Sequence, residues 1–198
     1  MLEDYPKEII LKDGTGLTLR PLEAGDEASL FQMFQDLSDD DRWFSDGDVT
    51  DIRTIERWVR HQDLNRAVPI LAVLEGRIVA YATLHRKYRG ARGHIGKVRI
   101  LVSAPFREKN LGTWMLFEIM NLAISMGLEI LVMELVEDRD AIVIKGAKRL
   151  NFFQEALLRD YIKDRQGNDH NLVMMVKRLY LGWKYAEGLT AENPLLVM

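Results

Sequence analysis

The chain has 198 residues and a mass of 22.9 kDa; 47% of its residues are hydrophobic and 29% are charged. This is enough sequence for one domain with a sizeable core, and the composition is too hydrophobic for a disordered chain. The formal net charge of −3 and the pI of about 5.9 argue against a nucleic-acid-binding protein, which usually needs a strongly basic face.

Missing residue types and segments narrow the class of protein further. The sequence has no cysteine, which excludes disulfide frameworks, thiolate zinc sites and cysteine nucleophiles. The N-terminus is acidic and has no apolar core segment, so it does not resemble a signal peptide. The longest apolar run, residues 68–74, is far shorter than the ~20 residues that cross a bilayer. We therefore expect a soluble cytoplasmic domain that makes no membrane contact.

The first third of the chain predicts a strand followed by two helices. Residues 17–19 alternate in polarity as a strand does, and this pattern ends at Pro21. Apolar residues then recur at helical spacing over residues 30–37 and again over residues 52–59. The aspartate-rich stretch between them, residues 38–48, is expected to be a loop.

The middle of the chain predicts an antiparallel meander of three strands. The expected strands are residues 70–74, 77–84 and 94–102. Glu75-Gly76 is typical of a hairpin turn, and residues 89–93 form the second turn.

After the meander, helices and strands alternate. A helix begins at Leu111 and is stopped by Gly127. The next expected elements are a strand (130–136), a helix (138–150) and two strands (153–162 and 172–176). We divide the chain into one domain, residues 1–178, and a C-terminal tail, residues 179–198. The apolar residues of the tail suggest that it packs on the domain or on a second copy in a homodimer: Trp183, Tyr185, Leu195, Leu196 and Val197.

The loop over residues 102–113, between the third meander strand and the next helix, has the features of an anion site. A strand-to-helix loop directs successive backbone N–H groups, and the positive end of the helix, toward one point. Arg107 and Lys109 add positive charge, and Gly112 allows a ligand to approach the backbone closely.

This loop resembles the pyrophosphate loop of the GNAT superfamily of N-acetyltransferases, whose pattern is Arg/Gln-x-x-Gly-x-Gly/Ala. Arg107 and Gly112 match, and Asn110 replaces the first glycine; asparagine is among the residues that best tolerate a left-handed backbone. Leu150-Asn151-Phe152 resembles the Leu-Gly-Phe step of the family. With the order of the elements, the resemblance spans residues 17–178.

The resemblance implies a mixed α/β (α+β) GNAT-like fold, in which a central sheet with an N-terminal antiparallel meander is flanked by helices. It also implies acetyl-CoA as cofactor and direct transfer of its acetyl group to a primary amine, on a small molecule or a protein lysine. The alternative is a catalytically weak acyl-CoA-binding sensor with the same fold. The cofactor contacts that the resemblance implies are Leu101, Val102, Arg107, Glu108, Lys109, Asn110, Leu111, Gly112 and Thr113.

The acid and base that many family members use are missing from their usual positions. Counting back from Phe152 places the tyrosine acid at Ala147, and counting back from Arg107 places the glutamate base at Gly96. These two replacements motivate the sensor alternative.

Four other residues are candidates for the catalytic and acceptor sites. Glu134 interrupts an apolar strand, where a carboxylate is costly unless it is paired or opens to a cleft; it is either a base or amine anchor, or it lies past the end of the strand and pairs with an arginine. His94 is either a general base or an exposed hairpin histidine. Tyr81 and His85 share one face of the second meander strand and are expected to line the acceptor pocket, unless Tyr81 packs in the core.

A further segment also resembles part of the family. Residues 38–44, Ser-Asp-Asp-Asp-Arg-Trp-Phe, are similar to the Ser-x-x-Asp-Arg-Tyr segment of bacterial GNAT domains that acetylate protein lysines, although a capped turn explains them equally well. The family uses this region for acceptor specificity, so we expect it near the acceptor cleft. The four histidines lack metal-ligand spacing, so no metal site is expected.

Overall fold

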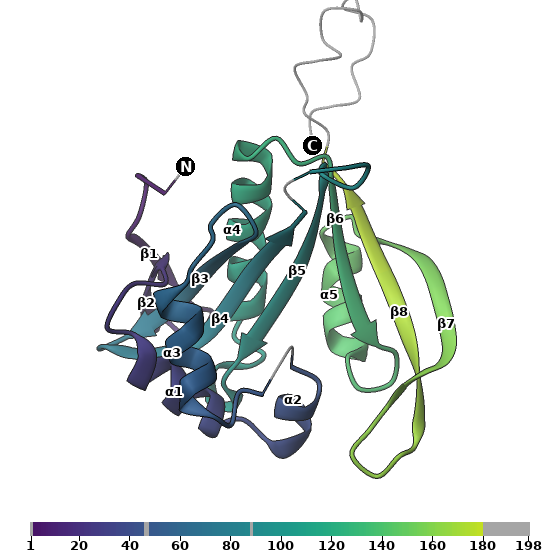
Figure 1. Cartoon of the computed structure of the whole chain (residues 1–198), viewed down its shortest axis with the longest axis horizontal. Coiled ribbons are helices and arrows are strands. Elements are labelled where there is room, and N and C mark those ends of the chain that lie inside the picture. The colour runs from purple at the N-terminus through teal and green to yellow at the C-terminus, as the bar shows by residue number, and fades with distance from the viewer. Residues whose placement is uncertain (1, 46–47, 88, 180–198) are drawn as a thin grey trace, which may run out of the picture.

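An eight-stranded sheet forms the centre of the structure, a computed structural model that describes residues 2–45, 48–87 and 89–179 (Figure 1). Its strands are β1 (Lys7–Ile10), β2 (Gly16–Pro21), β3 (Ala67–Leu74), β4 (Arg77–Arg86), β5 (Ile95–Val102), β6 (Ile130–Val136), β7 (Phe153–Lys163) and β8 (Asp169–Arg178). They lie in the order β1-β2-β3-β4-β5-β6-β8-β7, and every neighbouring pair is antiparallel except β5 and β6. The mixed sheet and its N-terminal meander are thereby confirmed.

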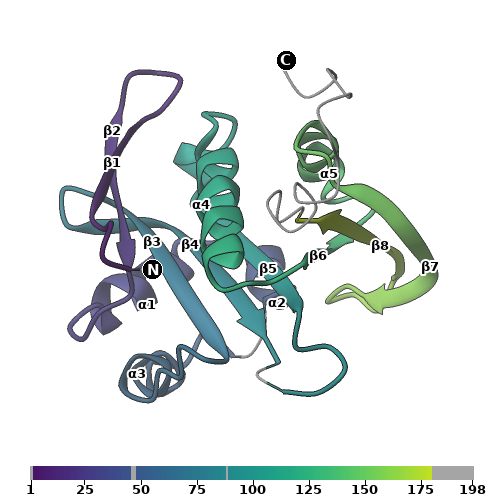
Figure 2. The ribbon, with the colours of Figure 1, turned by 90° about the horizontal axis from the view of Figure 1, so that it is seen from above.

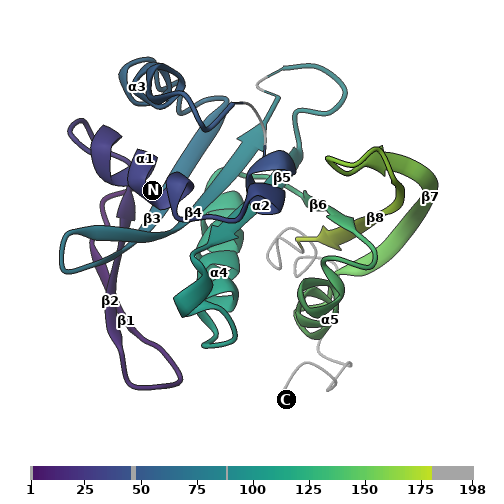
Figure 3. The ribbon, with the colours of Figure 1, turned by 90° about the horizontal axis from the view of Figure 1, so that it is seen from below.

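Helices cover both faces of the sheet (Figures 2 and 3). One face carries α1 (Glu27–Gln35), α2 (Asp39–Trp43) and α3 (Ile52–Arg60), and the other carries α4 (Leu111–Ser125) and α5 (Ala141–Arg149). A short 3-10 helix, η1 (Ala104–Phe106), connects β5 to α4.

The stripe of apolar residues on α4 explains why this helix packs on the meander. Leu111, Met115 and Ile119 are almost completely buried, as are Ala82 and Leu84 of β4 in the same core cluster. Small alanines on the sheet let the helix approach, and burial of each large side chain contributes about 1.5–3 kcal/mol. A second cluster, which includes Leu30, Phe34, Ile55 and Leu71, fills the space between α1, α3 and the opposite face.

The sheet divides between β5 and β6. These strands pair through only three residue pairs, Ile95–Ile130, Gly96–Leu131 and Lys97–Val132. β5 continues to Val102 alongside β4, and β6 continues to Val136 alongside β8, so the two strands separate beyond the third pair. Figure 1 shows the resulting V, which opens toward η1 and the N-terminus of α4.

Two elements were not expected from the sequence. β1 was not predicted because its four residues are too few to show a pattern, and it is held by contacts far away in the chain. Just before and within it, Tyr5 and Lys7 each donate a hydrogen bond to the buried carboxylate of Glu118 on α4, at 2.9 and 2.8 Å.

The predicted loop over residues 38–48 is also wrong in part, because it contains α2. Ser38 caps this helix by accepting a hydrogen bond from the amide of Asp41 at 3.1 Å. Serine at the N-cap with acidic residues in the first turn is a standard helix start, but five residues are too few to show helical periodicity.

The described residues end at Leu179. Leu179 is buried, and its amide donates a hydrogen bond to the carbonyl of Glu129. The other residues of the expected tail, 180–198, lie outside the described residues, and so do the apolar side chains that suggested a homodimer. Among the residues that are described, no helix is long and apolar enough to cross a membrane.

Candidate active site

The loop between η1 and α4 presents a row of backbone amides at the mouth of the V. Asn110 is the N-cap of α4 and has a left-handed backbone (φ 70°), as expected from its place in the loop pattern. Glu108 is also left-handed (φ 60°). Within the described part of the chain, the amides of residues 109–113 make no hydrogen bond of normal geometry. Backbone amides at the positive end of a 15-residue helix are suited to binding an anion.

The two cations of the loop point in different directions. The guanidinium of Arg107 donates to the carbonyl of Val102 at 3.0 Å and to the carboxylate of Asp41 at 2.7 Å, so it lies across the mouth of the V. Lys109 pairs with Asp13 in the β1–β2 turn at 2.8 Å. The charge of Lys109 is therefore paired with the neighbouring turn.

The far half of β5 has polar backbone groups on the side of the gap. The amide of Ser103 donates to the carbonyl of Val79 in β4. Because backbone groups alternate in direction along a strand, those of Val102 point away from β4 and toward the gap. The carbonyl of Val102 is already occupied by Arg107, so its amide is the group that remains for a ligand in the gap.

Asp41 on α2 connects the two sides of the V. Its carboxylate accepts hydrogen bonds from Arg107, next to α4, and from Arg139, in the loop between β6 and α5. Burial alone would raise the pKa of Asp41, but hydrogen bonds from Arg107, Ser38 and Arg139 outweigh it and hold the pKa below its usual value. The carboxylate is therefore charged at neutral pH and holds both arginines at the mouth of the V.

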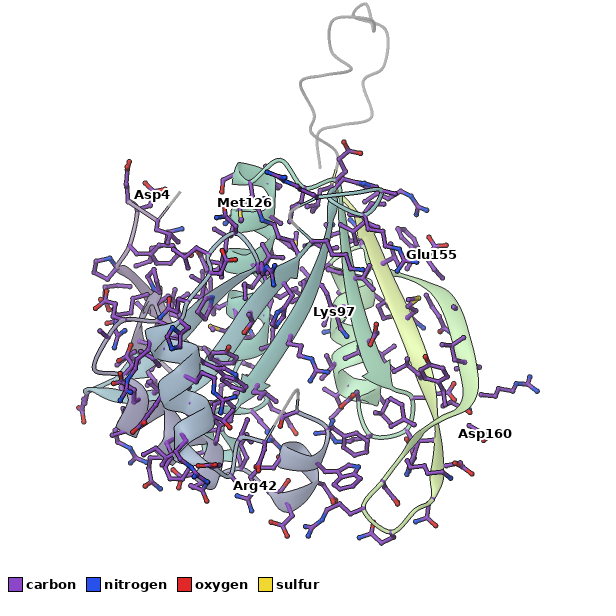
Figure 4. All side chains as sticks on the ribbon, viewed as in Figure 1. Asp4, Arg42, Lys97, Met126, Glu155 and Asp160 are labelled. Carbon is purple, nitrogen blue, oxygen red and sulfur yellow. The ribbon has the colours of Figure 1, made fainter. Side chains whose placement is uncertain are left out.

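Glu134 lies on β6 beside the gap, within the strand rather than past its end. Its carboxylate pairs with the ammonium of Lys97 on β5 at 2.8 Å. Lys97 is labelled in Figure 4, next to the gap. About a third of each side chain is exposed, so both are open to solvent on this face of the sheet. The expected arginine partner of Glu134 is thus replaced by a lysine.

A pocket of about 340 Å³ lies on the same face, between the meander and the helices α1 and α3. It is lined by Tyr81 and His85, the two residues that were expected to contact the acceptor, and by Leu101. The register places Tyr81 opposite Leu101, and His85 opposite Lys97. The pocket therefore extends along β4 from Tyr81 to His85. The register partner of His85 is Lys97, which pairs with Glu134.

His94 lies apart from these groups. It immediately precedes β5, and its carbonyl accepts hydrogen bonds from the amides of Glu129 and Ile130 where β6 begins. Eight residues of strand separate it from Val102, which is about 26 Å at ~3.3 Å per residue. The structure therefore places His94 at the closed end of the V, away from the expected reaction centre.

Ala147 and Gly96, the expected positions of the acid and the base, are both packed in the core. A Cβ on Gly96 would lie 2.6 Å from Leu84 and 2.9 Å from Leu131, so this position faces the core and has no room for a glutamate. Ala147 is buried on α5, a continuous helix. Neither position can hold a polar catalytic group without repacking the core.

Two residues of the site were missed in the sequence. Thr83 also lines the pocket, and its spacing from Tyr81 and His85 at every second residue of β4 could have identified it. Arg139 had no such signal, because its role depends on the fold bringing Asp41 and Arg107 next to it.

The sequence matches the model of the Acetyltransferase (GNAT) family over residues 30–152. No curated protein sequence matches the chain.

Solved structures share the fold at low sequence identity. The GNAT domain of S. lividans PAT is 19% identical with a TM-score of 0.72, and the match covers 88% of this chain and 97% of that one. Ribosomal-protein-alanine N-acetyltransferase from Brucella melitensis is 18% identical (TM-score 0.72; 81% and 99% covered). The putative acetyltransferase yncA from Salmonella typhimurium, solved with its cofactor acetyl-CoA, is 18% identical (TM-score 0.70; 82% and 94% covered). These likenesses agree with the fold expected from the sequence.

Proposed function

Because the chain belongs to the acetyltransferase (GNAT) family, we propose that it is an N-acetyltransferase that moves the acetyl group of acetyl-CoA directly to a primary amine. The observation that carries the proposal is the row of free amides of residues 109–113 at the mouth of the V. Acetyl-CoA supplies the activated acetyl group, and the protein binds it, orients the amine and handles the proton.

The loop residues would hold the diphosphate of acetyl-CoA. In this proposal the amides from Lys109 to Thr113, including those of Asn110, Leu111 and Gly112, donate to the diphosphate, and the left-handed residues Glu108 and Asn110 shape the turn. Arg107 adds a charge-assisted donor at the same mouth. A Cβ on Gly112 would meet only Val102, at 4.0 Å, which leaves space beside the amides for the ligand.

The thioester would lie deeper in the V, against β5. The backbone amide of Val102 borders the gap, and Leu101 lines the pocket. A backbone donor at this point would hydrogen bond the thioester carbonyl and stabilise negative charge on its oxygen. The acceptor amine would come from the pocket that Tyr81 and His85 line.

The amine must be neutral to attack, so a group near it must receive a proton. Glu134 stands beside the gap on the same face as the pocket, and in our proposal it attracts the cationic amine and takes its proton through water or directly. His94, at the closed end of the V, has no part in this proposal.

The test is release of the CoA thiol from acetyl-CoA, followed with a thiol reagent over a panel of amines and lysine peptides. The wild-type protein should release thiol in an amine-dependent way. The Gly112→Glu variant should lose CoA binding by at least about tenfold, because it places a carboxylate against the phosphates. Calorimetry measures the binding, and circular dichroism shows whether the fold is intact.

Gly112→Ala is the matched control, since a Cβ fits at this position. It should bind CoA nearly as the wild type does. Unchanged CoA affinity in Gly112→Glu would contradict the placement of the diphosphate. Tight CoA binding without turnover on any amine would favour the acyl-CoA sensor, the alternative that the closed positions at Gly96 and Ala147 support.

A further inference from the structure

Lys97 places an amine of the protein itself at the point where the sheet divides. It is the last residue of β5 that pairs with β6, opposite Val132. Glu134 lies two residues farther along β6, about 7 Å past that last pair, where the two strands have begun to separate. The ammonium of Lys97 reaches across this start of the gap and pairs with the Glu134 carboxylate at 2.8 Å (Figure 4).

This amine lies on the open face of the sheet. The register places Lys97 beside His85, which lines the pocket, whereas its neighbour Gly96 faces the core. About a third of the Lys97 side chain and a third of the Glu134 side chain are exposed. A molecule that enters the gap can therefore reach the ammonium of Lys97.

Two other lysines near the V are turned away from it. The ammonium of Lys109 pairs with Asp13 in the β1–β2 turn. The ammonium of Lys177, on β8, donates to the carbonyl of Leu150 at the end of α5, at 2.7 Å. Lys97 differs from both, because its amine faces the gap and contacts the carboxylate beside it.

We infer that Lys97 is a self-acetylation site, which takes the acetyl group of acetyl-CoA when no amine acceptor is bound. This inference rests on the proposed function, in which Glu134 takes the proton of the attacking amine. An amine in hydrogen-bond contact with that base is already where the amine of an acceptor has to be. Lys97 is an internal acceptor in this reaction and not a catalytic residue.

The transfer to Lys97 balances without any further reactant. Glu134 takes one proton from the Lys97 ammonium and passes it to solvent. The lone pair of the resulting amine attacks the thioester carbonyl carbon, so the C–N bond of an amide forms and the C–S bond breaks. The nitrogen loses a second proton to the departing thiolate, which leaves as the CoA thiol. Lys97 becomes neutral, and Glu134 is released from its ion pair.

The chain contains a matched control lysine. Lys7 pairs with Glu118 at 2.8 Å, the same distance as in the pair of Lys97 and Glu134, and its side chain is 32% exposed against 35% for Lys97. Lys7 belongs to β1, the edge strand farthest from the gap within its half of the sheet. Chemical acetylation by acetyl-CoA in solution should therefore reach both lysines similarly, whereas self-acetylation should favour Lys97.

The test incubates the protein with acetyl-CoA and no amine. Peptide mass spectrometry follows acetylation of each lysine, and a thiol reagent follows CoA release. Wild type should release about one thiol per chain in a burst and acetylate Lys97 at least about tenfold faster than Lys7. The rate constant should not depend on protein concentration, because the reaction takes place within one chain.

Four variants identify the groups that the burst requires. Lys97→Arg keeps a cation beside Glu134 but should lose the burst, because a guanidinium does not accept the acetyl group. Glu134→Gln should slow acetylation of Lys97 by about tenfold or more. Gly112→Glu should lose the burst together with CoA binding, and Gly112→Ala should keep it. Circular dichroism shows whether each variant is folded.

Equal acetylation of Lys97 and Lys7, a rate constant that rises with protein concentration, or an undiminished rate in Glu134→Gln would overturn the inference. If added amines release thiol but Lys97 stays unmodified, the proposed function stands and the inference fails. If Lys97 is acetylated but no added amine releases thiol, self-acetylation stands and the proposed transfer to a separate amine fails.

Discussion

Two asparagines of this chain, Asn110 and Asn151, occupy positions where the GNAT pattern usually has glycine. Both have left-handed backbones, with φ of 70° and 59°. Asparagine reaches this conformation at lower cost than other side chains, so each turn keeps its shape without glycine. The left-handed backbone was predictable from the motif, and the position of the loop between a strand and a helix predicted its amide donors.

At Asn110 we expect glycine to be accepted and a β-branched residue to be rejected. Asn110→Gly should keep CoA affinity within about twofold, because glycine adopts this φ readily. Asn110→Val should lose about 1–2 kcal/mol, in stability or in CoA binding, from the strain of a left-handed backbone. Calorimetry with CoA and thermal unfolding measure both. Equal behaviour of the two variants would show that the turn does not need the left-handed conformation.

Variants of Glu134 and of its partner Lys97 distinguish a catalytic role of the Glu134 carboxylate from a structural one. If Glu134 attracts and deprotonates the amine, Glu134→Gln should lower kcat by about tenfold or more and leave CoA affinity nearly unchanged. Lys97→Gln removes the same ion pair from the other side and serves as the control. Lys97→Gln should keep most of the turnover. Similar losses in both variants would indicate that the pair as a whole, and not the carboxylate, is needed.

Among the elements, α2 shows why part of the site could not be read from sequence. Periodicity identified the longer helices and the meander, because their buried faces repeat every three to four or every two residues. α2 has five residues, and its function depends on partners 66 and 98 residues away, Arg107 and Arg139. Motifs predict the local shape of a loop, but contacts between distant loops arise from tertiary packing.

The ion pairs of Asp41 with Arg107 and Arg139 should stabilise the protein in a pH-dependent way. Asp41→Asn removes the charge that holds Arg107 and Arg139, and we expect a loss of about 1–2 kcal/mol at pH 7, since both arginines are partly exposed. Because the pKa of Asp41 is lower in the folded protein than in the unfolded chain, its contribution is complete above the unfolded pKa of ~3.9. It is lost as the pH falls through the lower, folded value.

Urea unfolding of wild type and Asp41→Asn between pH 3 and 7 measures this contribution as a difference. The difference in unfolding free energy should be constant from pH 7 to about pH 5 and should shrink in more acidic solution. A difference that stays constant over the whole range would mean that the side chain acts through packing and not through its charge.

For the whole molecule, we expect acetyl-CoA to link the two halves of the divided sheet. β1 to β5 form one half and β6, β8 and β7 the other, joined in the sheet by three residue pairs and across the mouth of the V by Asp41. A cofactor that fills the V would contact both halves. Its binding should therefore stabilise the molecule as a whole and not only the loop.

At a CoA concentration about 100 times its Kd, the gain is about 2.7 kcal/mol, which raises Tm by about 5–10 °C for a domain of this size. Gly112→Ala should show this shift and Gly112→Glu should not. Hydrogen exchange then distinguishes a link from a local contact, because a cofactor between the strands slows exchange on both sides, in residues 98–102 and in residues 133–136. Protection confined to residues 98–113 would mean that the ligand binds the loop without entering the V. The separation of β5 from β6 would then not be part of the cofactor site.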